Sequence, residues 1–238
     1  MLAVIGGTGY LGLGRVLERL DVVTPYGLAT VNHVRILDEE LYFIPRHGER
    51  HDLPPHMINY KANIYALKKL GTKAIFATYA CGAISKYKPG DLVMPDDFIS
   101  FGPAVTFYDD FSAGIKHVDF TEPFDFRLCR RVMEIASAEK IPIKQGGVIA
   151  TTSGPRYETR AEVAALERMG ANLVSMTSGY EITLAHELEI PLAALAIITN
   201  HAAGKAKGPL RHEEFLTITE KAKDKIDGIV GGLLEEVS

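Results

Sequence analysis

The sequence has no tryptophan, two cysteines among 238 residues, and no apolar run long enough to span a membrane. Cys81 and Cys129 are too few for a disulfide scaffold, and we expect two free thiols in a reducing compartment. A basic block is also missing, because 26 Lys and Arg face 30 Asp and Glu, for a net charge of −4. We therefore expect neither a nucleic-acid partner nor a membrane partner.

The first residues carry no targeting signal. The apolar segment 1–5 runs directly into glycines, without the basic region and long apolar stretch of a signal peptide. We interpret this segment as a first β-strand and expect a cytoplasmic protein.

Hydrophobic patterning predicts an α/β fold. Apolar β-type runs alternate with segments of helical periodicity, and several runs are apolar on both faces, as is typical of strands covered on both sides. We expect one domain, residues 1–238, with a mixed central β-sheet flanked by helices in three layers. The predicted strands are Leu2–Ile5, His33–Leu37, Leu41–Pro45, Ala74–Thr78, Leu92–Phe98, Gly146–Thr151, Leu173–Met176 and Leu192–Thr199, and the predicted helices are Asn59–Leu70, Phe126–Glu139, Thr159–Met169, Gly179–Leu188 and His212–Leu234.

A glycine-rich loop follows the first predicted strand. Residues 7–12 match the dinucleotide-binding pattern G-x-G-x-x-G. However, only residues 38–40 separate the next two predicted strands, so these strands must form an antiparallel hairpin and not a βαβ crossover. The backbone N–H groups and the Thr8 hydroxyl could instead surround an inorganic anion, and a tight turn without a ligand is the third alternative.

A second polar segment follows the predicted hairpin. The planar guanidinium of Arg46 could hold phosphate by two hydrogen bonds, and His47 could add one more donor. A solvated polar turn is the alternative. Four histidines lie between residues 33 and 56, but their spacing is not that of a compact metal site, and we expect no metal.

Two later segments could recognise a planar base. Glu158 follows Tyr157 in one, and Asn200 ends an apolar run in the other. A carboxylate only accepts hydrogen bonds, whereas an amide donates and accepts. The pair could hold a base edge with an N–H beside a carbonyl, such as hypoxanthine or guanine, while Tyr157 packs on the ring. Taken separately, Glu158 could be a first-turn helix acid and Asn200 a turn residue.

In this order along the chain, the segments resemble the trimeric-type purine nucleoside phosphorylases and methylthioadenosine phosphorylases. The resemblance runs from Ile5 to about Gly204 and rests on the loops Gly6–Gly9, Arg46–Gly48, Gly154–Glu162 and Met176–Thr177. Glu158 and Asn200 resemble the 6-oxopurine branch, close to the methylthioinosine phosphorylases. Adenosine-type members have a small hydroxyl residue and an aspartate at these two positions, and a second aspartate where this chain has Ala202.

The resemblance implies a set of site residues. Tyr79 stands where the family has Asn or Thr, so we do not expect its side chain to contact phosphate. From the sequence alone, Met176 is a core residue, and Thr177 and Ser178 could cap a helix with Glu181 as the matching acid. By resemblance, the residues that contact phosphate would be Thr8, Arg46, His47, Ala80 through its N–H, and Thr177. The residues that contact the base and sugar would be Cys81, Gly82, Tyr157, Met176, His117 and His212. The catalytic pair on the base would be Asn200 and Glu158.

The implied reaction is phosphorolysis of 6-oxopurine ribonucleosides, inosine or guanosine, to the free base and ribose 1-phosphate. Inorganic phosphate would be the co-substrate, and no cofactor would be needed. Phosphorolysis of S-methyl-5'-thioinosine or S-methyl-5'-thioadenosine is the alternative, and a dinucleotide-binding α/β protein is the remoter one. The sequence leaves open the choice between hypoxanthine and guanine.

Two histidines bear on the sugar end and on assembly. His212 is at the position that faces the 5' group, where a histidine favours a 5'-hydroxyl over an apolar 5'-methylthio group. His117 matches a residue that, in the family, reaches into the neighbouring subunit's sugar pocket. The resemblance therefore implies a homotrimer or a dimer of trimers, and the sequence does not decide between them.

Overall fold

A computed structural model describes residues 1–10, 12–36, 38–112, 114–206 and 212–235, with the backbone only for residues 212–216. In chain order the elements are β1 (Leu2–Gly6), β2 (Arg15–Thr24), β3 (Gly27–Ile36), β4 (Glu39–Pro45), a 3-10 turn (Pro55–Met57), α1 (Tyr60–Lys69), β5 (Ala74–Ala83), β6 (Leu92–Met94), β7 (Asp97–Ser100), α2 (Phe126–Ala138), β8 (Ile143–Gln145), β9 (Val148–Thr151), α3 (Arg160–Arg168), β10 (Ala171–Ser175), α4 (Ser178–Glu187), β11 (Leu192–His201) and α5 (His212–Leu234).

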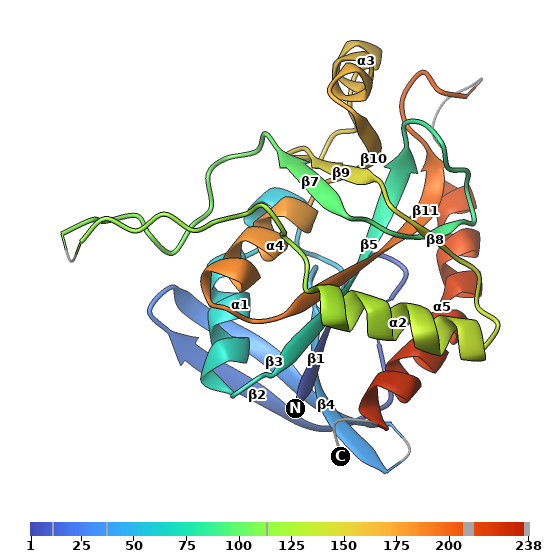
Figure 1. Ribbon diagram of the computed structural model, residues 1–238. Coiled ribbons are helices and arrows are strands. Elements are labelled where there is room, and N and C mark those ends of the chain that lie inside the picture. The colour runs from blue at the N-terminus through green and yellow to red at the C-terminus, as the bar shows by residue number, and fades with distance from the viewer. Residues whose placement is uncertain (11, 37, 113, 207–211, 236–238) are drawn as a thin grey trace.

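All these strands belong to one mixed sheet that branches at β5 (Figure 1). One path runs β2-β3-β4-β1-β5-β10-β9-β7, while β11 pairs with β5 and continues the sheet through β6 to β8. The long strand β5 is parallel to β1 and β11 and antiparallel to β10. Because β1, β4, β5 and β11 run in the same direction, the segments that leave their carboxyl ends meet at one edge of the sheet.

Two apolar layers cover the central strands, which confirms the predicted three-layer α/β fold. Successive residues of a strand point to opposite faces, so Ile75 and Ala77 of β5 pack with α1 and α4, whereas Phe76 packs with α2 and α5. Strand β11 alternates in the same way, and all its residues from Leu192 to Thr199 are buried. This explains why the central strands read as continuous apolar runs.

Helix ends follow the local sequence. The side chains of Asn59 and Asp125 accept hydrogen bonds from backbone N–H groups in the first turns of α1 and α2. Thr159 and Glu162 form a capping box at the start of α3, in which each side chain bonds the other residue's backbone N–H. All five predicted helices are present, within two residues of the predicted ends.

Several strand predictions were wrong. β3 begins at Gly27 and not at His33, and β5 continues to Ala83 instead of ending at Thr78. The segment from Arg15 to Thr24 was not predicted, yet it forms β2, which pairs with β3 in an antiparallel hairpin. The run from Leu92 to Phe98 is two strands, β6 and β7, which pair with different neighbours. The short strand β8 was not predicted either. The predicted hairpin of β3 and β4 is confirmed, and a strand follows the glycine loop where a dinucleotide-binding βαβ unit would have a helix.

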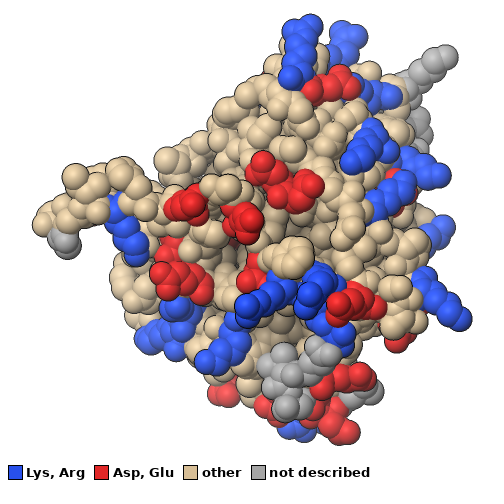
Figure 2. Space-filling model, in the orientation of Figure 1, with Lys and Arg blue, Asp and Glu red and all other residues tan. Residues whose placement is uncertain are grey.

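The segment between β7 and α2 projects as a long arm from the body of the molecule (Figures 1 and 2). We call residues 101–125 the arm. Its base is fixed by Glu187 of α4, whose carboxylate accepts hydrogen bonds from the Thr106 hydroxyl (2.5 Å) and the Phe107 N–H (2.6 Å). Further along, the His186 ring bonds the Asp119 carbonyl at 2.8 Å.

On the face shown in Figure 2, acidic and basic side chains are interspersed.

Candidate active site

A cavity of about 430 Å³ lies where the carboxyl ends of β1, β4, β5, β10 and β11 meet. Its walls are formed by the loop after β1, residues of the segment 46–55 after β4, the last third of β5, the loop before α3, the end of β10 with the two residues after it, and the end of β11. The volume is in the range of small-molecule sites. Segments that are distant in the sequence thus meet around one space.

Eleven of the thirteen predicted site residues line this cavity. They are Thr8, Arg46, His47, Ala80, Cys81, Gly82, Tyr157, Glu158, Met176, Thr177 and Asn200. The other lining residues are His51, Asp52, Leu53, Pro54, Pro55, Pro155, Val174, Ser175 and Thr199. The phosphate-type and base-type residues therefore share one continuous cavity.

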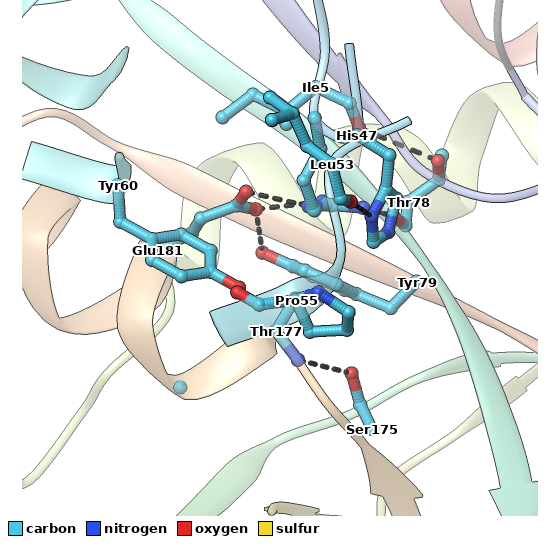
Figure 3. A network of polar contacts seen from close by, with 12 residues as sticks. Ile5, His47, Leu53, Pro55, Tyr60, Thr78, Tyr79, Ser175, Thr177 and Glu181 are labelled. Carbon is cyan, nitrogen blue, oxygen red and sulfur yellow. Dashed lines mark hydrogen bonds and ion pairs between the residues drawn. The ribbon is translucent and has the colours of Figure 1, made fainter. Parts of the chain in front are cut away.

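Arg46 lines the cavity but is only 2 % exposed, and three hydrogen bonds to the protein hold its side chain. Its Nε and Nη2 donate to the two carboxylate oxygens of Glu181 at 2.6 and 2.7 Å, and its Nη1 donates to the Thr78 carbonyl at 3.0 Å (Figure 3). Burial by itself lowers the pKa of Arg46, but the Glu181 carboxylate more than offsets this effect and raises it. The guanidinium is thus a permanent, fixed positive charge.

The glycine loop approaches this guanidinium closely. A Cβ at Gly7 would lie 2.3 Å from Arg46 Nη1, so a side chain there would collide with the guanidinium. Gly9 has φ +84, and a Cβ there would lie 2.0 Å from the Thr219 Cβ of α5. Both glycines are thus required by close packing, and the loop holds Thr8 at the cavity wall.

His47 is buried beside Arg46, and its tautomer follows from one contact. Its Nδ1 lies 2.8 Å from the Leu53 carbonyl, which only accepts, so Nδ1 carries the proton. Burial and the Arg46 charge lower the pKa of His47 to about 4. The neutral ring then presents Nε2 as an acceptor. The predicted donation by His47 to a phosphate would therefore require a protonated imidazole.

Thr177 lies between the end of β10 and the first turn of α4, and the sequence-based account of this turn needs correction. Thr177 is the N-cap residue but makes no side-chain cap bond, and Glu181 bonds Arg46 instead of acting as the matching acid. Ser178 bonds Thr151, Oγ to Oγ1, at 2.8 Å and lies outside the cavity lining. The Thr177 hydroxyl is thus not engaged in capping the helix.

Two further lining residues, Glu158 and Asn200, offer complementary groups. Glu158 precedes α3 and is 7 % exposed, and its Oε1 accepts from the Thr152 hydroxyl at 2.6 Å. The Asn200 Oδ1 accepts from the Thr199 hydroxyl at 2.7 Å, and its Nδ2 donates to the His201 carbonyl at 2.9 Å. Each contact fixes a side chain. Among the described residues, these contacts leave free a second carboxylate oxygen on Glu158, and one lone pair and one N–H on Asn200.

Cys81 and Tyr157 form less polar parts of the wall. Cys81 is 1 % exposed, and burial raises the pKa of its thiol, which keeps it neutral. Cys81 and Cys129 are both free, as expected. Tyr157 is 44 % exposed, so its ring is accessible from solvent as well as from the cavity.

Two predicted site residues are not placed at this cavity. His117 is exposed on the arm, where its ring contacts Phe111 edge-to-face at 5.8 Å, away from the cavity of its own chain. His212 begins α5, and its side chain lies outside the described residues. The 5' end of the sugar site therefore stays a sequence-based prediction.

Glu181 and Tyr79 are the residues that sequence reasoning missed. Glu181 is 135 positions from Arg46, and Tyr79 donates its hydroxyl to Glu181 Oε2 at 2.9 Å across 102 positions. The one feature of the sequence that could have pointed to them is that this acidic residue and this tyrosine each lie within a mostly apolar segment. The Tyr79 side chain is fully buried and is not part of the cavity lining.

The family model of the phosphorylase superfamily matches residues 1–235. The chain belongs to this superfamily. The predicted family is thereby confirmed, and the cavity described above lies entirely within the matched region.

Relatives within the phosphorylase superfamily carry two kinds of name. A probable S-methyl-5'-thioinosine phosphorylase of Methanopyrus kandleri is 40 % identical over 240 residues, covering 99 % of this chain and 92 % of the relative. A 6-oxopurine nucleoside phosphorylase of Pyrococcus furiosus is 38 % identical over 234 residues, covering 94 % and 88 %. Both names denote phosphorylases of 6-oxopurine nucleosides that differ at the 5' group.

Solved structures of the superfamily share the fold. A methylthioadenosine phosphorylase of Schistosoma mansoni, in complex with adenine, has a TM-score of 0.90 and 28 % identity, covering 99 % of this chain and 91 % of that one. In the part of the chain that the structure describes, no helix is long and apolar enough to cross a membrane. Among the same residues, no group of three or more His, Cys, Asp or Glu side chains is arranged to hold a metal ion.

Proposed function

We propose that this member of the phosphorylase superfamily cleaves 6-oxopurine ribonucleosides, inosine or guanosine, with inorganic phosphate, releasing the base and ribose 1-phosphate. The observation that carries the proposal is the shared cavity, whose lining includes both a fixed cation, Arg46, and an acceptor-plus-amide pair, Glu158 and Asn200. The 6-oxopurine relatives support the base, and phosphate would be the co-substrate without a further cofactor. The whole chain, residues 1–238, would act as one catalytic domain.

The phosphate subsite would lie at the Arg46 end. Arg46 supplies N–H groups, Thr8 and Thr177 supply hydroxyls, and the Ala80 N–H adds a backbone donor. Thr177 stands at the N-terminus of α4, where the helix dipole favours an anion. His47 would accept from a phosphate O–H through Nε2, or take up a proton when the anion binds.

The base subsite would lie at the Glu158 end. The free oxygen of Glu158 would accept the N1 proton of the purine and, for guanine, a proton of the 2-amino group. Asn200 would meet N7 and O6, while Tyr157 packs on the ring and Met176 lies under the ribose. A 6-aminopurine presents the opposite pattern and would leave buried polar groups unpaired, which costs about 1–3 kcal/mol for each group.

The reaction would proceed by stretching of the bond between C1' and the purine nitrogen. The electron pair of that bond leaves with the purine, where the Asn200 N–H would donate to the negative charge that develops on N7 and O6, while Glu158 would hold the base through its N1 proton. The proton of the hydrogen phosphate would pass to the departing purine, so that the base leaves neutral. A phosphate oxygen then attacks C1' of the oxocarbenium-like ribosyl group and forms the new C–O bond. Positioning of this kind supplies about 7–11 kcal/mol, and preorganised dipoles add to it.

The sugar subsite would be completed by a neighbouring subunit. His117 on the projecting arm would enter the cavity of the next protomer in a homotrimer, or in a dimer of trimers. Phosphorolysis of S-methyl-5'-thioinosine is the second candidate, favoured by relatives of equal identity that carry this name. His212 would support a 5'-hydroxyl instead.

A matched substrate panel tests the proposal. Inosine, guanosine, adenosine and their 5'-methylthio counterparts are incubated with and without phosphate, and base release is measured. We expect rapid release from 6-oxopurine nucleosides that stops without phosphate. Preference for the 6-amino compounds would overturn the base assignment, and release that does not depend on phosphate would overturn the reaction type. The paired 5' compounds decide between the two candidate substrates.

A further inference from the structure

Tyr79 is a buried tyrosine that does not line the cavity but contacts Arg46, which does. Its side chain has 0 % exposure, its hydroxyl donates to Glu181 Oε2 at 2.9 Å, and its ring lies 4.6 Å from the Arg46 Cζ (Figure 3). One side chain thus contacts both members of the buried Glu181–Arg46 ion pair. Burial and the neighbouring Glu181 carboxylate raise the pKa of Tyr79, so the phenol keeps the proton that it donates.

The Arg46 guanidinium has five N–H groups, and its contacts with the protein determine which of them are left for a ligand. Within the described residues, Nε, one N–H of Nη2 and one N–H of Nη1 are used by Glu181 and Thr78. One N–H on each terminal nitrogen is left, and Arg46 lines the cavity. Whether these two point at one anion depends on the rotation of the guanidinium, which the Glu181 carboxylate sets.

The Glu181 carboxylate itself needs support, because it is 1 % exposed. A buried ion pair is favourable only when its geometry is good and further hydrogen bonds satisfy the remaining lone pairs. Tyr79 provides the third hydrogen bond to this carboxylate, and its ring covers the guanidinium. Without the hydroxyl, the carboxylate would lose a donor on the oxygen that bonds Nη2, and the side chain would have more rotational freedom.

We propose that Tyr79 is a positioning residue of the phosphate subsite, acting on the oxyanion through Glu181 and Arg46 without touching it. The position that the sequence resemblance assigns to an Asn or Thr in contact with phosphate is used here to orient the arginine. This chain thereby gives up one direct donor and relies more heavily on the orientation of Arg46. The inference rests on the proposed function, because it assigns a role within the phosphate subsite.

The test is Tyr79→Phe, which removes only the hydroxyl and keeps the ring on Arg46. We expect the KM for phosphate, and the Kd for phosphate measured by calorimetry without nucleoside, to rise about tenfold, as for loss of a hydrogen bond to a charged group. At saturating phosphate, kcat and the KM for inosine should stay within about twofold of wild type, because the base subsite is untouched. A merely structural role would lower Tm without this split.

Tyr87→Phe is the matched control. Tyr87 is equally a buried tyrosine, and its hydroxyl bonds the Gly146 carbonyl, away from the cavity. This variant should match Tyr79→Phe in any loss of Tm while keeping the wild-type Kd for phosphate. If Tyr79→Phe and Tyr87→Phe bind phosphate equally well, the inference is wrong.

A double-mutant cycle with Arg46→Lys tests whether Tyr79 acts through the arginine. In an Arg46→Lys background there is no planar fork to orient, so adding Tyr79→Phe should change the Kd for phosphate by less than about twofold. An undiminished tenfold effect in that background would show that Tyr79 does not act through Arg46. If the wild-type protein neither binds phosphate nor releases base in its presence, the proposed function itself is wrong. If the wild type does both and Tyr79→Phe binds phosphate as tightly as the wild type, only the inference about Tyr79 is wrong.

Discussion

At the scale of single residues, the choice of base depends on one amide. The Asn200 Oδ1 is held by the Thr199 hydroxyl and its Nδ2 by the His201 carbonyl, so the side chain is preoriented with one donor and one acceptor to spare. Asn200→Asp removes the donor and adds a charge. We expect kcat/KM for inosine to fall about 100-fold or more, and the ratio of adenosine to inosine cleavage to rise. Steady-state kinetics with both nucleosides check this, and an unchanged ratio would contradict the role of Asn200.

His47 gives a prediction for pH and stability at the same scale. Burial and Arg46 lower the pKa of His47 from 6.5 to about 4 in the folded protein. The unfolded chain therefore takes up the proton first as the pH falls, so the contribution of neutral His47 is complete above about pH 6.5 and is lost toward about pH 4. Between about pH 6.5 and pH 5 the folded state should lose about 2 kcal/mol through this group alone.

The measurement is urea unfolding of wild type and His47→Gln across this pH window. The stability difference between the two proteins should change by about 2 kcal/mol as the pH falls, with wild type losing more. Added phosphate should reduce the change, because a bound anion favours the protonated imidazole. Parallel pH profiles for the two proteins would show that His47 is not held neutral by the fold.

Much of the candidate site could be predicted from the sequence because its residues lie in short contiguous motifs. Three short segments have the composition of a turn or loop, and they contain Thr8, the pair Arg46 and His47, and the pair Tyr157 and Glu158. The residues that support them could not be predicted in the same way. Glu181 and Tyr79 reach Arg46 from 135 and 33 positions away, and only the fold brings them together.

At the scale of elements, the glycine loop and α5 form one packed unit. Gly9 meets Thr219, and the buried Tyr10 donates its hydroxyl to Asp227 at 2.7 Å. Gly9→Ala places a methyl group on Thr219 and forces a strained φ, so we expect a loss of about 2 kcal/mol or more in unfolding free energy and weaker phosphate binding. Gly12→Ala, at a position with open space around it, should change stability by less than about 0.5 kcal/mol. Chemical denaturation of both variants checks this, and equal losses would contradict the packing argument.

How well each strand could be predicted from its hydrophobic pattern depends on which of its faces are buried. β5 and β11 are covered on both faces, so their first parts are mostly apolar, and Ala74–Thr78 and Leu192–Thr199 were predicted as strands. The last residues of both strands are more polar or smaller and were not predicted as strand. β2 is an edge strand with exposed residues from Arg15 to Arg19, which leaves no alternation to detect. β6 and β7 are separated only by Pro95 and Asp96, and the change of pairing partner between them is a tertiary property.

At the scale of the whole molecule, the arm raises the question of how the site is completed. Residues 101–125 project from the body, yet their base is fixed by Glu187 and by the ring contact of 5.1 Å between Tyr26 and Phe107. A projecting segment with a fixed base suits a contact between protomers, and it carries the exposed side chains of Phe111 and Ile115. For the proposed trimer, light scattering should give a mass of three or six chains.

Complementation between two variants tests whether protomers share a site. Asn200→Asp removes the base contact of a subunit's own cavity, and His117→Ala removes what that subunit would give to its neighbour. In a closed ring, a site is complete only when an Asn200 subunit lies beside a His117 subunit. Co-expression of the two variants in equal amounts should therefore restore about a quarter of wild-type inosine cleavage at subsaturating substrate, because each requirement is met by half of the subunits. If His117 acted within its own chain, no mixed assembly would contain more intact sites than the separate variants, and the activity of the mixture would be the average of the two.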